Sequence, residues 1–408
     1  MKAKQFSLNV AMVGAVLVAA ITIAGSHLSF HHEVGPSRGV LNNFVGPSRV
    51  EAQGTPALAN SSQFVIAANV PNRGTLGDLT YDKNHQRLWF AGFFYPDGNA
   101  AYSYDIPSGK LNSYPLPKMT GADYQSSGLA VASDGTVWIG GGTTILHLDP
   151  VSGQMQSYSL PQATSALPST DPAASHSFSQ IVGLTIDKNG KVWVSRSNVL
   201  GLTSLDPSTG QFNYVPWTPD DGLPLKLFTA PDGTVWATTW FRPGISREAS
   251  VTTTSFDPTS KVPTPHNLPS MTLAFDDSGN VLSVGGSGSL GIKILNPKTS
   301  AIASDAHLAE SGVLGDFVAD GPSGTWITDD RQGSIVNYDS SNGRWEMYPL
   351  PSRSVGSMGI STPPPAPGYK SAAPTGNVPF DVTGITSDST GRLWVLGGGW
   401  DELAYVNP

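Results

Sequence analysis

Seven imperfect copies of one pattern run along most of this chain, and they constrain its fold more than any other feature. Each copy has four short apolar runs separated by turns: Asp-Gly or Asn-Gly after the first run, and Asp-Pro-x-x-Gly before the fourth. One copy reads Gly128-Leu-Ala-Val-Ala-Ser-Asp-Gly-Thr-Val-Trp138, then Leu148-Asp-Pro-x-x-Gly153, then Tyr158-Ser-Leu-Pro161. Asp-Gly and Asn-Gly adopt the positive φ angles of a tight hairpin, and proline and glycine suit the second turn. We therefore expect each copy to form four antiparallel strands, one blade of a β-propeller.

A tryptophan shortly after the first turn marks six of the copies, a leucine takes its place in the other, and the count is therefore seven. This tryptophan slot holds Trp89, Trp138, Trp193, Trp236, Leu282, Trp326 and Trp394. The spacings between them run from 43 to 68 residues, and the typical propeller period is about 40–50. A large apolar side chain at one position per blade is expected to pack between adjacent blades rather than to bind a ligand.

The last copy is incomplete, and its missing strand has a candidate at the other end of the chain. Residues 384–408 supply three runs, after which the chain ends at Pro408. The segment 63–71 (Gln-Phe-Val-Ile-Ala-Ala-Asn-Val-Pro) matches the outer-strand pattern of 154–161. Placing it in the last blade leaves no sheet without its outer strand. The sequence thus predicts an all-β fold, a seven-bladed β-propeller of four-stranded antiparallel blades closed by an N-terminal strand.

The N-terminal segment has the pattern of a targeting signal. Lys2 and Lys4 precede an uncharged apolar stretch over 10–25, and small residues follow at 24–26. We expect residues 1–26 to be a signal peptide or an N-terminal membrane anchor, 27–62 a flexible linker, and 63–408 the propeller. The body is then extracytoplasmic, either secreted or held at the outer side of the membrane by residues 8–25 if these are not cleaved.

Composition restricts the partners. The chain has no cysteine and a formal net charge of −8. An acidic surface argues against nucleic acid and anionic membranes as partners, and the absence of thiols excludes disulfides and thiolate metal sites. We expect a monomer whose partner is a small molecule, a peptide or a glycan.

Propeller topology indicates where that partner would bind. The short hairpin turns fall on one face, the bottom, whereas the loops after the tryptophan strands and between blades fall on the other, the top, where variable loops concentrate binding. Long insertions at 162–181 and 352–382 lie on the top face, as does the loop 240–248. In that loop the candidate ligand-binding residues are Trp240, Phe241, Arg242 and Arg247, since an exposed aromatic pair beside two cations suits ligand contact.

Acidic residues also converge on the top face. Asp78 and Asp316 stand at the start of two inner runs, Asp329 and Asp330 end another run, and 401–402 is an Asp-Glu pair. Carboxylates gathered from adjacent blades could hold Mg²⁺ or Ca²⁺, which prefer oxygen ligands, so Asp78, Asp316, Asp329 and Asp330 are the candidate metal ligands. The alternative is that these acids end strands and face water. The eight histidines have no metal-ligand spacing, and no nucleophile elbow or phosphate loop stands in a suitable context.

The repeat, with its Asp-Gly-Thr-Val-Trp138 and Leu148-Asp-Pro-x-x-Gly153 elements, resembles that of the streptogramin B lyase (virginiamycin B lyase) family over most of residues 64–408. It resembles bacterial propellers of the gluconolactonase and NHL type more loosely. The lyase resemblance implies carbon–oxygen elimination on a cyclic depsipeptide, with Mg²⁺ held by glutamates and a histidine as acid–base group. In this chain the family's acidic slot reads Gly92, Gly141, Arg196, Thr239, Gly285, Asp329 and Gly397. Only Asp329 keeps an acid there, so those catalytic roles do not transfer residue by residue.

Three functional hypotheses remain at this point. The first is an exported propeller that binds a ligand or partner at its top face. The second is a divalent-metal-dependent lyase or hydrolase of the streptogramin B lyase type that uses Asp316 and Asp329. The third is a structural scaffold at the cell surface. A shared fold does not decide among them.

Overall fold

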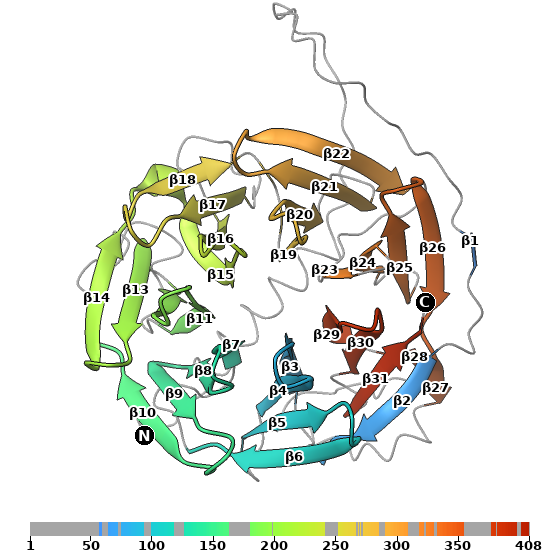
Figure 1. The fold of residues 1–408 in the computed structure, drawn as a ribbon, viewed down its shortest axis with the longest axis horizontal. Coiled ribbons are helices and arrows are strands. Elements are labelled where there is room, and N and C mark those ends of the chain that lie inside the picture. The colour runs from blue at the N-terminus through green and yellow to red at the C-terminus, as the bar shows by residue number, and fades with distance from the viewer. Residues whose placement is uncertain are drawn as a thin grey trace, which may run out of the picture.

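The computed structural model arranges seven β-sheets in a ring (Figure 1). It describes residues 57–58, 64–71, 75–93, 99–117, 126–162, 180–197, 199–240, 252–266, 268, 270, 272–284, 290–308, 318–321, 324–329, 333–354, 377–380, 382–397 and 401–407. The expected seven-bladed β-propeller is confirmed.

Each blade runs from an inner strand beside the ring axis to an outer strand at the rim. Blade one comprises β3 (Thr75–Asp82), β4 (Arg87–Phe93), β5 (Ala100–Asp105) and β6 (Lys110–Pro115). Blade two comprises β7 (Ser126–Val131), β8 (Val137–Gly141), β9 (Thr144–Leu148) and β10 (Met155–Ser159). Blade three comprises β11 (Ile181–Ile186), β12 (Val192–Arg196), β13 (Gly201–Asp206) and β14 (Gln211–Pro216).

The remaining blades follow the same order. Blade four comprises β15 (Leu223–Thr229), β16 (Val235–Trp240), β17 (Thr252–Phe256) and β18 (Pro263–His266), preceded by a 3₁₀ turn at Pro219–Asp221. Blade five comprises β19 (Leu273–Phe275), β20 (Val281–Val284), β21 (Leu290–Asn296) and β22 (Ala301–Leu308). Blade six comprises β23 (Val318–Gly321), β24 (Gly324–Asp329), β25 (Ser334–Asp339) and β26 (Arg344–Pro349).

The seventh blade closes the ring as the sequence predicts. It contains β29 (Val382–Ser387), β30 (Leu393–Gly397) and β31 (Glu402–Val406), and its outer strand is β2 (Phe64–Asn69). β2 pairs antiparallel with β31, from Phe64 opposite Val406 to Asn69 opposite Glu402. Strands from both ends of the propeller sequence therefore share one sheet (Figure 1).

The tryptophan slot forms the contacts between blades. Trp193 packs with Leu227, Val235 and Phe256 of blade four, and Trp394 packs with residues of blade one, Leu88 among them. The other slots contact the next blade in the same way, and each of the seven side chains is at most 3 % exposed. The structural role expected for the tryptophans is confirmed.

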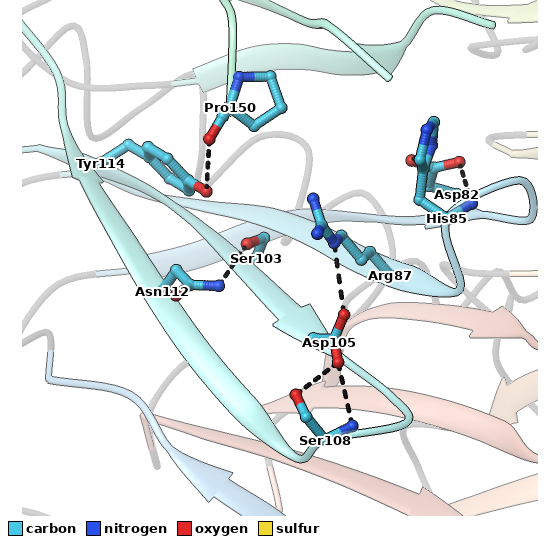
Figure 2. A network of polar contacts seen from close by, with 9 residues as sticks. All are labelled: Asp82, His85, Arg87, Ser103, Asp105, Ser108, Asn112, Tyr114 and Pro150. Carbon is cyan, nitrogen blue, oxygen red and sulfur yellow. Dashed lines mark hydrogen bonds and ion pairs between the residues drawn. The ribbon is translucent and has the colours of Figure 1, made fainter. Parts of the chain in front are cut away.

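Aspartates fix the bottom-face turns. In blade one, Asp105 accepts hydrogen bonds from the backbone N–H and the hydroxyl of Ser108 and from Arg87 Nε (Figure 2). Acceptance of these bonds lowers the pKa of Asp105. Across the blade boundary, the Tyr114 hydroxyl donates to the Pro150 carbonyl at 3.5 Å. These turns are occupied by structural contacts of their own.

Two further pairings lie outside the seven blades. β1 (Ala57–Leu58) runs parallel to β26 and adds a fifth strand to blade six, so part of the segment expected to be linker lies on the rim. β27 (Ser352–Ser354) pairs with β28 (Asn377–Pro379) at the base of the second long insertion. The expected signal peptide or anchor at residues 1–26, including the apolar segment 8–25, lies outside the described residues. Within the described part of the chain, no helix has the length and hydropathy needed to cross a membrane.

Candidate functional site

Strand direction defines the top face of the ring. The turns after the inner strands and those between third and outer strands lie at the bottom, so the loops after the second strands and the connections between blades lie at the top. Successive inner strands contact one another from β3 through β7 and β11 to β15, and from β19 through β23 and β29 back to β3. A candidate site is thus formed by the top ends of the second strands and by the axis-facing edge of the inner strands.

One inner-strand position is glycine in three of the seven blades, and we call it the glycine slot. It lies two residues before the partner of the tryptophan slot, and it holds Gly128, Gly183 and Gly384 in blades two, three and seven. A Cβ at Gly183 would lie 2.3 Å from the Leu225 carbonyl oxygen, and one at Gly384 would lie 2.8 Å from Leu79 Cβ. Glycine is needed in blades three and seven because the inner strand of the next blade lies against this position.

Blade one places an aspartate in the glycine slot. Asp78 lies at a β-bulge between Gly77 and Thr80, and its backbone has a φ of +60°. A bulge leaves one residue outside the ladder and redirects its side chain, and a positive φ is tolerated by aspartate better than by most residues. Asp78 therefore lies within β3, half-buried, rather than at the start of the inner run as the sequence suggested.

Blade four places a lysine in the same slot. Lys226 lies at a bulge between Pro224 and Leu227, where its backbone N–H donates to Thr238 Oγ1 at 3.2 Å. Its neighbour Leu227 is buried against blade three, whereas Lys226 is exposed. Because the two faces of this sheet pack on adjacent blades, an exposed side chain on its innermost strand faces the ring axis.

Asp78 and Lys226 thus place opposite charges on the inner wall of the ring. The described inner strands contain two further charged residues, Asp82 and Asp320, and both lie next to the bottom-face turns. Their blades are separated by two others, and β3 and β15 lie on different sides of the ring centre (Figure 1). The sequence analysis did not single out Lys226. An alignment of Gly128-Leu129 and Gly183-Leu184 with Lys226-Leu227 would have identified its slot.

A third charge lies at the top end of β12. Arg196 is 4 % exposed. Its Nη1 donates to the Pro161 carbonyl at 2.9 Å, and its Nε is buried with no hydrogen-bond partner. Burial lowers the pKa of Arg196, and a smaller effect of Tyr214 opposes that shift.

An acidic pair occupies the same face in blade seven. The Asp401 backbone carbonyl accepts the Val70 N–H at 2.7 Å, and its Oδ1 is buried without a hydrogen-bond partner. Burial and, to a smaller extent, the charge of Glu402 raise the pKa of Asp401 to about 6. Glu402 is 3 % exposed.

The structure leaves most predicted site residues untested. Trp240 ends β16 opposite Leu223, but the structure does not describe its side chain. Phe241, Arg242 and Arg247 lie outside the described residues. The same holds for Asp316, Asp330 and the side chain of Asp329. In the part of the chain that is described, no group of three His, Cys, Asp or Glu side chains is arranged to hold a metal ion. The Mg²⁺ or Ca²⁺ site therefore stays a prediction.

The bottom face has a groove of its own. It lies between blades four and five, has a volume of about 390 Å³, and is lined by Asp232, Trp236, Asp257 and Lys298 among others. These residues belong to hairpin turns, apart from Trp236, which is the tryptophan slot of blade four. The groove is an alternative location for a ligand, and a ligand bound there would lie beside Lys298.

Comparison with known proteins identifies the fold of this chain but assigns it to no family. No protein-family model matches the chain, and no curated protein sequence matches it. A streptogramin B lyase structure superimposes with a TM-score of 0.61 at 16 % identity, covering 86 % of this chain and 99 % of that one. A catalytically inactive virginiamycin B lyase from Staphylococcus aureus with quinupristin gives 0.59 at 16 %, covering 84 % and 98 %. The chain has the propeller fold of these lyases.

Other propellers are similar to the same degree. YCF48 bound to D1 peptide gives a TM-score of 0.59 at 15 % identity, covering 87 % of this chain and 100 % of that one. An extracellular domain of a one-component system from B. thetaiotaomicron gives 0.52 at 15 %, with 43 % of that chain covered. At these identities the similarity concerns the fold alone.

Proposed function

We propose that this chain is an exported β-propeller that binds a ligand at the centre of its top face and does not convert it chemically. The observation that carries the proposal is Lys226, an exposed cation on the innermost strand of a blade. The fold does not require a charge there, because the same slot holds Gly183 in blade three and Thr272 in blade five. A charge retained on a packed scaffold where a neutral residue suffices is typical of binding.

The charges of the inner wall indicate the class of ligand. Lys226 offers three donors and a positive charge, and Asp78 offers acceptor oxygens and a negative charge. A ligand with groups of both kinds, such as a peptide or a polar small molecule, complements this wall better than an apolar one. Peptide binding by YCF48 and depsipeptide binding by virginiamycin B lyase agree with a peptide-like ligand on this fold.

Export is part of the same proposal. It rests on the Lys2, Lys4 and 10–25 pattern, and the extracellular domain with the same fold agrees with it. Secretion and retention at the outer side of the membrane by residues 8–25 are distinguished by fractionating cells and determining the N-terminus of the mature chain.

The test is a thermal-unfolding panel with three probes: quinupristin, a short neutral peptide with free termini, and an oligosaccharide. We expect at least one probe to raise Tm of the parent. The rise should vanish in Lys226→Met and persist in Lys226→Arg, while both variants keep the parental Tm without probe. A panel in which no probe gives a Lys226-dependent shift contradicts the proposal.

The lyase alternative is tested alongside it. Asp316 and Asp329 would hold Mg²⁺, which would stabilise the fold by binding to it and would polarise the ester. Incubation with quinupristin and Mg²⁺, followed by liquid chromatography and mass spectrometry, separates the hypotheses, because elimination gives a ring-opened product of unchanged mass that elutes differently, whereas hydrolysis adds one water. Turnover that Asp329→Asn abolishes supports the lyase and contradicts simple binding.

A further inference from the structure

We propose that Arg196 anchors a carboxylate group of a ligand at the top of the interface between blades two and three. Its charge lies on the second strand of blade three, whereas Lys226 lies on the inner strand of blade four. It is formed by Arg196, the last residue of β12, and by Pro161, two residues after the blade-two outer strand β10.

The guanidinium group is buried with its hydrogen-bonding capacity only partly used. Arg196 has five N–H donors. Nη1 is used by the Pro161 carbonyl, and Nε has no acceptor although it is closed off from solvent. Among the described residues Arg196 forms no ion pair, and a neutral backbone carbonyl does not balance its charge.

Such a residue is costly to retain for packing alone. A buried charge without a partner destabilises a fold, and an apolar side chain would fill the same space without that cost. Four other second strands reach this level with small neutral residues, namely Gly92, Gly141, Thr239 and Gly397, and β24 reaches it with Asp329. Arginine in blade three alone of these therefore indicates an anion supplied from outside the packed core.

The geometry favours a planar anion. With Nη1 committed to a carbonyl, Nε and Nη2 remain on the opposite edge of the guanidinium fork. Two parallel donors on that edge match the two oxygens of a carboxylate. β12 ends at Arg196 on the top face, so the ligand group would approach from that face.

The first experiment measures Tm of the full chain in sodium acetate, sodium sulfate and sodium chloride at equal ionic strength. We expect acetate to raise Tm above the chloride value by about 2 °C at ten times its Kd. Sulfate stabilises folds by exclusion from their surface, and we expect its effect to be independent of Arg196. Arg196→Met should abolish the acetate effect. Arg196→Lys, which keeps the charge and loses the fork, should weaken acetate binding about 10-fold or more, and it serves if Arg196→Met does not fold.

Three results would overturn the assignment: an acetate effect unchanged in Arg196→Met, a sulfate effect that Arg196→Met removes to the same extent as that of acetate, or no specific effect of acetate. A fourth result would also overturn it, namely evidence that the counterion of Arg196 comes from this chain itself. The sequence 163–179 has a single acid, Asp171; if Asp171→Asn and Arg196→Met lower Tm equally and non-additively, the counterion belongs to this chain. Lys226→Met should leave the acetate effect intact, so failure here and failure of the proposed function are distinguishable.

Discussion

Adding one methyl group at Gly183 tests the packing of the inner strands that positions Lys226. In Gly183→Ala the new Cβ would lie 2.3 Å from the Leu225 oxygen and 2.8 Å from both Leu227 N and Ser195 Oγ. Ordinary contacts begin at about 3.4 Å, so the inner strand of blade four would have to move by about 1 Å. Two of the three atoms belong to the backbone and cannot rotate away.

The expected cost follows from that displacement. Overpacking of a fixed core costs about 1–3 kcal/mol, and alanine recovers about 0.4–1 kcal/mol by restricting the unfolded chain. Because the clash is with backbone, we expect Gly183→Ala to lower the free energy of unfolding by about 2 kcal/mol. Equilibrium guanidinium denaturation followed by tryptophan fluorescence measures it.

Gly77→Ala is the matched control. Gly77 lies at the bulge of the blade-one inner strand, but a Cβ there would have no atom within 4 Å. We expect this variant to be neutral or stabilised by up to about 1 kcal/mol. If Gly183→Ala unfolds like the parent, or if both variants lose the same free energy, close packing at the glycine slot is refuted.

Three further predictions concern the scaffold. Asp187→Ala removes the carboxylate that accepts from Trp193 Nε1 at 2.8 Å and from the backbone N–H groups of the turn. We expect the free energy of unfolding, measured by chemical denaturation, to fall by about 2 kcal/mol. A parental denaturation midpoint would contradict this expectation. Burial, followed by Asp276 and Asp277, raises the pKa of Asp320 to about 6, so the stability that this carboxyl contributes is present below about pH 4 and is lost as pH rises through about 6. Asp320→Asn should therefore raise Tm at pH 7.5 and lose that advantage at acid pH, whereas a pH-independent difference would show that the raised pKa is incorrect. Deleting residues 63–71 removes β2 and should lower Tm by about 5 °C or more, while deleting 27–50 should leave it unchanged; equal Tm values for the two deletions would refute closure by β2.

Most of the fold could be predicted because its signals are local. Asp-Gly turns, Asp-Pro-x-x-Gly turns and the tryptophan slot repeat in sequence, and the match of 63–71 to an outer strand gave the ring closure that β2 and β31 confirm. The pairing of β1 with β26 could not be foreseen, because two residues carry no periodicity and the pairing depends on tertiary position.

The site was less predictable because it depends on register. Lys226 reads as an ordinary residue of an apolar strand until the bulge after Pro224 places it in the glycine slot. Arg196 was visible as a departure from the acidic slot of the lyases, but its burial and its unused Nε follow from packing against blade two. The loop residues Phe241, Arg242 and Arg247 remain predictions from sequence alone.

The location of the ligand is the central question, and NMR of ¹³C-dimethylated lysines answers it most directly. Lys226→Arg assigns the Lys226 signal, and Lys298, in the bottom groove, is the reference for the opposite face. On titration with a probe that raises Tm, we predict that the Lys226 signal shifts with saturation while the Lys298 signal stays in place. A titration that shifts Lys298 and leaves Lys226 unchanged would place binding in the bottom groove and contradict the account.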